Sequence, residues 1–201
     1  MSGRLNRSTE EIIKAAISLF KENGYENVSV NDICQKADVS RSSFYYSFSG
    51  KRDIIEFILE DVRNNQNAVV NDIIFAKNDL ERMWLICDRF LTIAIEFGPE
   101  LMASLMQLEL KGEIDQLSRI HMTDDWLIKF ADSCKMSGII KNTSPAEIFA
   151  PFGIEIAYQI TYKWCLQGGN FNLRSVVREY NEIFYNVAPE YRMSKEDREK
   201  L

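Results

Sequence analysis

The chain has 201 residues, of which 46% are hydrophobic and 27% charged, so it is large enough for one medium domain or for a small domain joined to a larger one. It contains one histidine and four widely separated cysteines without a CxxC pair, which excludes the usual zinc-ligand spacings and a disulfide framework. The formal net charge of −6 argues against a chain that is basic throughout.

Charge is distributed unevenly along the chain. The segment through residue 53 contains 8 Lys and Arg and 7 Asp and Glu, whereas the remainder contains 16 and 23. The acidity therefore belongs to the C-terminal part, and the total charge does not exclude a nucleic-acid partner for the N-terminal part.

The sequence shows no pattern for export or membrane insertion. The N-terminus lacks the basic start, apolar run and small-residue cleavage site of a secretory leader. The most apolar stretch, residues 148–166, has Glu155, Gln159 and Lys163 on one helical face, which favours a buried helix over a membrane span. We expect a cytoplasmic protein.

Helical periodicity dominates the chain, and no convincing run of alternating apolar and polar residues is present. The first helix begins at a capping box of Ser8 and Glu11 and ends at Asn23 and Gly24. Ser29 then opens a short second helix. A turn at residues 37–39, a third helix at about 40–46 and a long fourth helix after residue 50 follow.

Glycine and proline divide the rest of the chain. Between these breakers we predict helices at about 79–97, 100–110, 113–136, 145–167 and 173–186. We therefore predict an all-α fold of nine helices. A three-helix helix-turn-helix domain at 1–50 is joined by the fourth helix to a larger domain at 51–189, and a charged tail at 190–201 is expected to fray.

The second and third helices have the arrangement of a helix-turn-helix, in which the second helix enters the major groove. That helix, RSSFYY at residues 41–46, presents hydroxyls, an arginine and tyrosines. The segment resembles the N-terminal signature of TetR-family regulators over the first quarter of the chain. The matching positions are Phe20, Gly24, Tyr25, Ser29, Val30, Asp32, Ile33, Ala37, Asp38, Val39, Ser40, Phe44, Tyr45, Phe48 and Lys51. Ser42 and Ser47 depart from it, because glycine and histidine are usual there.

The resemblance implies a set of DNA-binding residues. Some approach the phosphate backbone, some read base edges, and the tyrosines lie beside the sugar-phosphate edge. These residues are Ser29, Asn31, Arg41, Ser42, Ser43, Tyr45, Tyr46 and Lys51. Arg41 has the donors for a bidentate pair with guanine. The alternative for any one of these eight residues taken alone is an ordinary solvated side chain. Phe44 and Phe48 are interpreted as core aromatics.

The last two predicted helices have apolar rows on more than one face, which indicates a partner surface. Trp164 followed by Gly168 also resembles the end of many TetR-type chains, whose last two helices form a four-helix dimer bundle. The predicted dimer interface is Phe152, Ile156, Ile160, Trp164, Val176, Val177, Tyr180, Ile183 and Phe184. A two-fold dimer would bind a near-palindromic operator.

The resemblance also implies a small-molecule pocket in the second domain. Candidate lining residues are Met102, Met106, Trp126, Phe130, Tyr158 and Tyr162, since methionine and aromatic side chains adapt to ligands. The alternative for each is an ordinary place in the core. His121 is interpreted as a surface or core residue rather than a proton sensor.

These patterns predict a DNA-binding transcriptional regulator, specifically a repressor that binds its double-stranded operator as a homodimer and is released by a small-molecule effector. We expect no enzyme activity, catalytic residues, metal or cofactor, because one histidine and scattered cysteines provide no nucleophile-base pair or ligand set. The alternative is a helix-turn-helix adaptor whose acidic second domain binds another protein.

Overall fold

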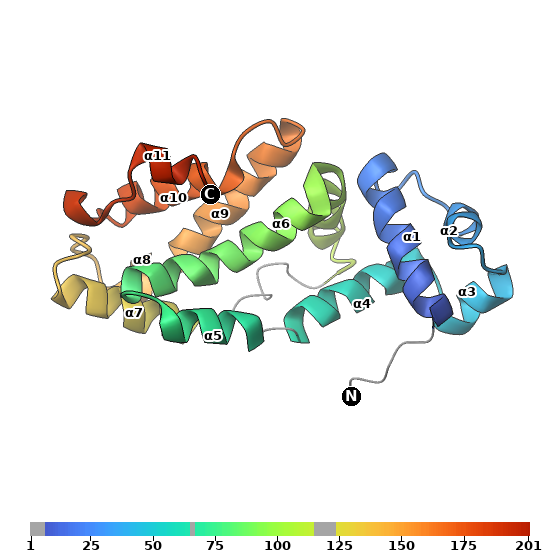
Figure 1. The fold of residues 1–201 in the computed structure, drawn as a ribbon, viewed down its shortest axis with the longest axis horizontal. Coiled ribbons are helices and arrows are strands. Elements are labelled where there is room, and N and C mark those ends of the chain that lie inside the picture. The colour runs from blue at the N-terminus through green and yellow to red at the C-terminus, as the bar shows by residue number, and fades with distance from the viewer. Residues whose placement is uncertain (1–6, 65–66, 115–123) are drawn as a thin grey trace.

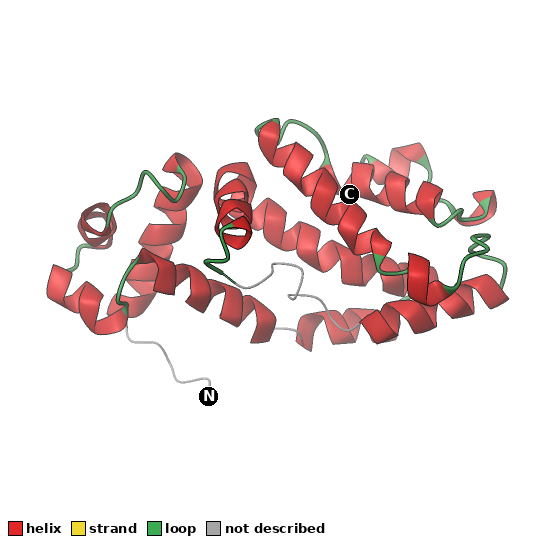
Figure 2. Ribbon diagram, turned by 180° about the vertical axis from the view of Figure 1, so that it is seen from behind, coloured by secondary structure: helices red, strands yellow, loops and turns green. Residues whose placement is uncertain are grey.

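The computed structural model describes residues 7–64, 67–114 and 124–201, and the described part is helical (Figures 1 and 2). Helix α1 (Arg7–Asn23) places Ile12, Ala16 and Phe20 inward, and all three are fully buried. Helices α2 (Val30–Ala37) and α3 (Arg41–Ser47) pack against α1 and complete a three-helix unit at one end of the molecule. The predicted all-α class and the N-terminal helix-turn-helix are confirmed.

Helices α4 (Lys51–Asn64) and α5 (Asn67–Phe75) lead away from this unit, and α6 (Asp79–Leu110) returns toward it (Figure 1). The two predicted helices at 79–97 and 100–110 are the halves of α6. Gly98 interrupts them with a φ of 76° and a ψ of 166°, a conformation that glycine adopts without strain. Pro99 follows at the start of the second half, where its missing N–H is tolerated.

The remaining helices are α7 (Asp124–Met136), α8 (Ala146–Phe149), α9 (Phe152–Leu166), α10 (Leu173–Phe184) and α11 (Lys195–Arg198), with a short 3₁₀ turn η2 at Pro189–Tyr191. The prediction of nine helices was too low for the described residues. It lacked α5 and α11, and it placed one helix over 145–167, where the chain leaves the helix at Ala150 and Pro151 between α8 and α9. Glu113 lies in a bend after α6 rather than in a helix, and His121 lies outside the described residues.

The charged tail packs on α10 instead of fraying. Arg198 donates from Nη1 to Oε2 of Glu182 at 3.2 Å, and the backbone N–H of Met193 donates to Oε1 of the same carboxylate at 3.1 Å. Because Glu182 is only 2% exposed, these bonds anchor the tail to an interior group.

Two apolar clusters form the core. The first extends from the helix-turn-helix unit, along both halves of α6, to the C-terminal part of α9 and the start of α10. The second lies at the opposite end, among the first half of α6, α7, α8 and the start of α9. The core is thus continuous across residue 50, and α6 contributes to both clusters.

Across the part of the chain that the structure describes, none of the helices is both long and apolar enough to cross a membrane. Three of the four cysteines are buried and Cys165 is half-buried, and all four are free thiols.

Candidate nucleic-acid interface

The helix-turn-helix is built from local capping interactions. Ser29 Oγ accepts from the backbone N–H of Asp32 at 3.2 Å, and Asp32 Oδ2 accepts from the N–H of Ser29 at 2.8 Å, which completes a capping box at the start of α2. Asp38 ends α2 in the left-handed region with a φ of 53°. Ser40 then caps α3 by accepting from the N–H of Ser43 at 3.1 Å. These caps set the turn between the two helices.

Helix α3 has one buried face and one exposed face. Phe44 is fully buried in the three-helix unit, whereas Tyr46 is 86% exposed and Tyr45 is 48% exposed. Arg41 and Ser42 lie on the exposed side, and the Arg41 guanidinium carbon is 6.0 Å from the centre of the Tyr45 ring. The structure therefore brings four of the predicted DNA-binding residues onto one outward surface, which we call the α3 face: Arg41, Ser42, Tyr45 and Tyr46.

The other predicted hydroxyl and amide groups lie beside the α3 face. Ser43 is half-buried, and its Oγ lies 2.8 Å from the Oγ of Ser40, at the helix start. Ser29 and Asn31 are exposed at the first turn of α2. Ser47 forms a hydrogen bond between its Oγ and Thr9 Oγ1 at 2.9 Å, so this departure from the family pattern joins the end of α3 to the start of α1.

Lys51 was expected to contact a DNA phosphate, but in the structure its ammonium contacts backbone carbonyls. Its ammonium donates to the carbonyl oxygens of Tyr25 at 2.6 Å, Val28 at 2.8 Å and Glu26 at 3.3 Å, and it lies 4.3 Å from the centre of the Tyr25 ring. Burial lowers the pKa of this ammonium, and the nearby Glu26 carboxylate opposes the shift. In this structure Lys51 connects α4 to the turn between α1 and α2. Spacing alone could not reveal that role.

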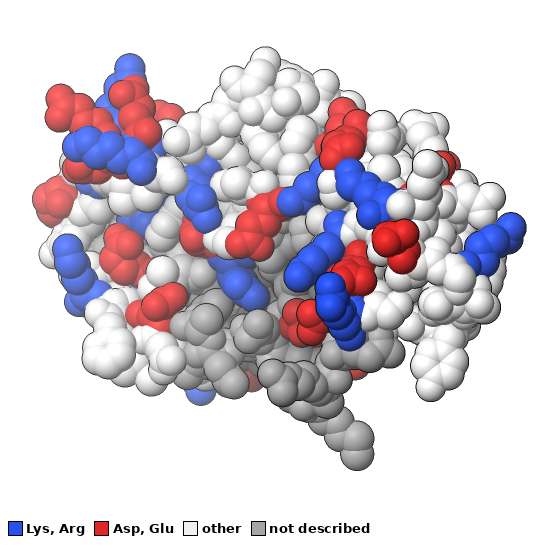
Figure 3. All heavy atoms as spheres, turned by 45° about the vertical axis from the view of Figure 1, so that its right-hand side comes forward, with Lys and Arg blue, Asp and Glu red and all other residues white. Residues whose placement is uncertain are grey.

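Basic and acidic groups alternate around the helix-turn-helix end. Figure 3, which brings this end forward, shows Lys and Arg interspersed with Asp and Glu. Lys36 pairs with Glu22 at 3.1 Å and Arg52 pairs with Glu56 at 2.9 Å. Arg41 forms no ion pair with a described residue, so its guanidinium is available to a ligand. The α3 face thus has one available cation among hydroxyl and phenol groups.

The predicted dimer residues divide into three groups, which are exposed, half-buried and buried. Tyr180 is 53% exposed, Ile183 60%, Phe152 49% and Phe184 38%, and the Phe152 and Phe184 ring centroids are 5.8 Å apart. Ile156 and Val176 are half-buried. Ile160, Trp164 and Val177 are buried in the protomer's own core, although Ile160 also lines a groove on the outside of α9 and α10. Exposed Ile148, Tyr162 and Leu166, which the prediction omitted from the interface, extend the surface along α8 and α9.

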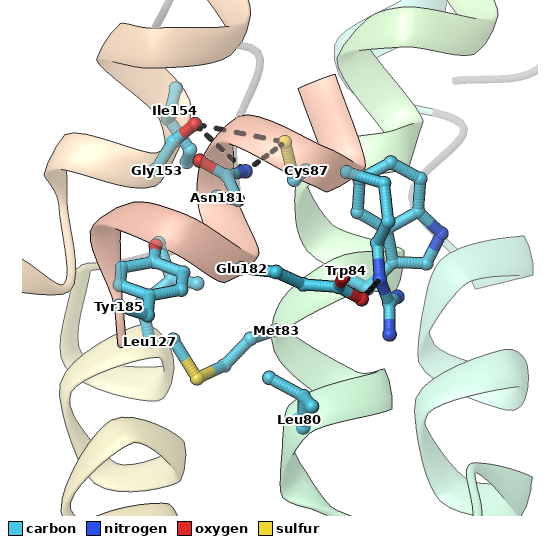
Figure 4. A pocket seen from close by; sticks show the side chains of 11 residues that line it. Leu80, Met83, Trp84, Cys87, Leu127, Gly153, Ile154, Asn181, Glu182 and Tyr185 are labelled. Atoms are coloured by element: carbon cyan, nitrogen blue, oxygen red, sulfur yellow. Dashed lines mark hydrogen bonds and ion pairs between the residues drawn. The ribbon is translucent and has the colours of Figure 1, made fainter. Parts of the chain in front are cut away.

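The six predicted pocket residues do not form one site. Met102 and Met106 are buried in the first cluster, and Tyr162 is 45% exposed. Trp126 and Phe130 contact each other edge to face on α7, whereas Tyr158 donates to the Glu109 carboxylate and stacks on Phe90. The structure instead contains a cavity between α6, α7, α9 and α10 (Figure 4), and none of the six lines it.

A capped helix-turn-helix on a larger helical domain defines the class of helix-turn-helix transcriptional regulators. Residues 12–58 match the model of the family described as "Bacterial regulatory proteins, tetR family". The N-terminal part of the chain therefore matches the TetR-family model, and the resemblance found in the sequence is confirmed.

One curated relative matches the N-terminal segment, and a solved structure has the same fold over most of the chain. The biofilm operon negative transcriptional regulator IcaR of Staphylococcus aureus is 38% identical over 47 residues, which are 23% of this chain and 25% of IcaR. The match thus spans about a quarter of that relative. The fatty acid degradation regulator FadR from Bacillus halodurans has the same fold, with a TM-score of 0.68, 18% identity and coverage of 91% of this chain and 97% of that one.

A second solved structure covers the chain to a similar extent. FadR from Bacillus subtilis in complex with stearoyl-CoA gives a TM-score of 0.65 at 21% identity, over 88% of this chain and 97% of that one. Both likenesses show that the fold of such regulators extends through the second domain.

Proposed function

We propose that this protein is a transcriptional repressor that binds a near-palindromic operator as a homodimer and leaves it when a small-molecule effector binds the helical domain. The observation that carries the proposal is the α3 face, which places exposed hydroxyls and an arginine without an ion-pair partner among the described residues on a capped second helix. A helix of this kind fits the major groove, where Arg41 reads a guanine and the neighbouring hydroxyls contact bases or phosphates. That IcaR is described as a negative regulator supports repression.

The proposed partner in the dimer is a second copy of the chain. Several large apolar side chains are exposed on the same two helices: Phe152, Tyr162 and Leu166 of α9 and Tyr180, Ile183 and Phe184 of α10. A groove lined by Gln159, Phe171 and Val176 continues this surface. An apolar patch of this kind marks a protein interface, and two-fold pairing would bury the same patch on both chains. The two α3 faces would then lie about 34 to 36 Å apart, one turn of B-DNA.

Effector release is proposed to act through α6. Its first half lines the cavity with Leu80, Met83 and Trp84. Its second half contacts the helix-turn-helix unit, where the Tyr25 N–H donates to Ser104 Oγ at 3.2 Å and Lys111 pairs with Glu26 at 3.1 Å. A ligand that shifts one half of α6 therefore changes the position of the α3 faces. It releases DNA if it favours an arrangement in which the two α3 faces no longer match the spacing of the DNA grooves. The FadR complex with stearoyl-CoA supports an effector of small-molecule type.

The test is selection of bound sequences from random duplex DNA, followed by binding of the enriched sequence at two salt concentrations and by light scattering of the complex. We expect a near-palindromic motif, two chains per duplex and weaker binding at higher salt. Enrichment of a single half-site by a monomer would overturn the dimer. Absence of any enrichment would overturn DNA binding and favour the adaptor, whose partner would then be sought among basic proteins.

A further inference from the structure

The cavity in the second domain combines apolar walls with buried polar groups. It has a volume of about 20 Å³, and its apolar lining includes Leu80, Met83, Leu127 and Tyr185. Figure 4 shows Asn181 and Glu182 of α10 on the same cavity, across from α6. A volume of this size holds about one water molecule, so a larger ligand must displace side chains. Met83 is the most adaptable of them.

Arg178 provides the first polar group. Its side chain is 3% exposed, Nε donates to Glu182 Oε1 at 2.7 Å and Nη2 donates to Glu81 Oε1 at 2.8 Å. The guanidinium also lies 4.9 Å from the centre of the Trp84 ring. Its Nη1 is buried and has no hydrogen-bond partner among the described residues. A buried N–H without a partner is costly, which favours a ligand acceptor at this point.

Asn181 provides the second polar group. Its residue is 5% exposed, and Nδ2 donates to the carbonyl oxygen of Gly153 at 3.3 Å and to Cys87 Sγ at 3.6 Å. The amide oxygen, Oδ1, is buried and has no partner in the described part of the chain. The cavity lining therefore has one unsatisfied acceptor as well as one unsatisfied donor.

The charges around the cavity select for an uncharged ligand. The positive charge of Arg178 is already balanced by the carboxylates of Glu81 and Glu182. Glu182 also accepts from Arg198, so neither sign is left in excess at these contacts. An anion in the cavity would meet the Glu182 carboxylate, whereas a cation would meet the Arg178 guanidinium, and either would lose its hydration.

We propose that this cavity is the effector site and that its ligand is an uncharged molecule with an amide-like group on a short apolar body. The carbonyl of the ligand accepts from Arg178 Nη1, an N–H of the ligand donates to Asn181 Oδ1, and the apolar body contacts Leu80, Met83 and Leu127. The inference rests on the proposed function in so far as the ligand is an effector. None of the sequence-predicted pocket residues takes part.

The charge class is tested by calorimetric titration of the full-length protein with hexanamide, hexanoate and hexylamine at neutral pH. The three probes share a chain length and differ in the charge of the head group. We expect hexanamide to bind about tenfold more tightly than either ion, because a charged head group entering this site is desolvated without compensation. Equal or tighter binding of hexanoate or hexylamine, or no binding by any of the three, would overturn the proposal.

The site is tested with Asn181→Leu, which removes both amide groups and keeps the number and branching of the side-chain heavy atoms. The control is Asn142→Leu, whose Nδ2 also donates to a backbone carbonyl at 3.3 Å but which lies outside the cavity lining. We expect hexanamide affinity to fall about tenfold in the first variant and to stay unchanged in the second. Unchanged affinity in both would place the ligand elsewhere. If Asn181→Leu fails to fold, the comparison of the three probes on the parent protein decides whether the proposed ligand class is correct.

The outcomes separate this inference from the function it serves. Selective hexanamide binding by a protein that enriches no DNA would keep the cavity assignment and overturn the regulator. An enriched palindrome without amide binding would keep the regulator and overturn only the ligand class.

Discussion

Lys51 Nζ lies 2.6 Å from the carbonyl oxygen of Tyr25 and 4.3 Å from the centre of its ring, so the first turn of α4 is tied to the turn that precedes α2. The same ammonium also satisfies the carbonyl of Val28. A lysine at this position therefore orients the helix-turn-helix relative to the rest of the chain, and its side chain is half-buried.

Replacing Lys51 with methionine leaves these partly buried carbonyls without their donor. We expect a loss of about 1 to 3 kcal/mol in the free energy of unfolding, measured by urea denaturation. Lys36→Met is the control, since it removes an exposed pair with Glu22 and is expected to lose at most about 1 kcal/mol. If Lys51→Met keeps parental stability and instead flattens the salt dependence of DNA binding, the lysine turns toward phosphate in the complex.

Arg41 is expected to determine one base pair of the operator. Arg41→Ala should relax the preference at that position, a loss of about 1 to 3 kcal/mol of discrimination, measured by binding to operators changed at single positions. Arg41→Lys keeps the positive charge but loses the planar donor pair, so it should lose discrimination while keeping most of the salt dependence. Parental specificity in both variants would remove Arg41 from the base-reading role.

The proposed dimer surface is tested at Ile183, which is 60% exposed on α10. Ile183→Glu places two charges at an apolar two-fold interface, so we expect monomers in sedimentation measurements and loss of operator binding. The matched control is Ile74→Glu on α5, where the parent side chain is 62% exposed and lies away from α9 and α10. Dissociation by the control and not by Ile183→Glu would assign the interface to α5.

Gly153 is predicted to tolerate no side chain. A Cβ at this position would lie 1.8 Å from the Tyr185 hydroxyl oxygen and 2.8 Å from the ring carbon that bears it. We expect Gly153→Ala to destabilise the protein by about 1 to 3 kcal/mol through overpacking, measured by thermal unfolding. Adding Tyr185→Phe removes the closest atom and should restore part of that loss, a coupling that a double-mutant cycle detects. Strict additivity would contradict this contact.

The hydrogen bonds at the starts of α2 and α4 should respond to acid. The Ser29 side chain, with its backbone N–H, lowers the pKa of Asp32, and Ser49 lowers the pKa of Asp53 in the same way. The ionised carboxylates therefore stabilise the folded state above the unfolded pKa of about 3.9, and this contribution is lost as the pH falls through the lower folded values. Asp32→Asn should make the free energy of unfolding less dependent on pH between about 4 and 2. A parental acid profile, followed by circular dichroism, would contradict the role of this cap.

Local signals in the sequence determined most of the helix-turn-helix. Ser29 and Ser40 mark the starts of α2 and α3, because a capping hydroxyl bonds to a backbone N–H only two or three residues away. The buried and exposed sides of α3 also follow from residues that are close in sequence. Phe44 was expected in the core and is fully buried there. The α6 halves were separately visible, but the sequence did not show that they form one interrupted element.

The sequence by itself determined the all-α class, the caps of α2 and α3 and which residues share an apolar face, since all of these depend on contacts within a few residues. The capping box expected at Ser8 and Glu11 does not begin α1, which starts at Arg7, and Glu11 pairs with Arg7 instead. Only the tertiary structure decided which apolar face a neighbouring helix covers, so that Ile160 and Trp164 are buried in their own chain while Ile183 stays exposed. It also decided that Lys51 reaches back over 26 positions to Tyr25, and that Arg178 meets Glu81 from 97 positions away. Helical periodicity states which residues share a face, but the packing of distant helices selects their partners.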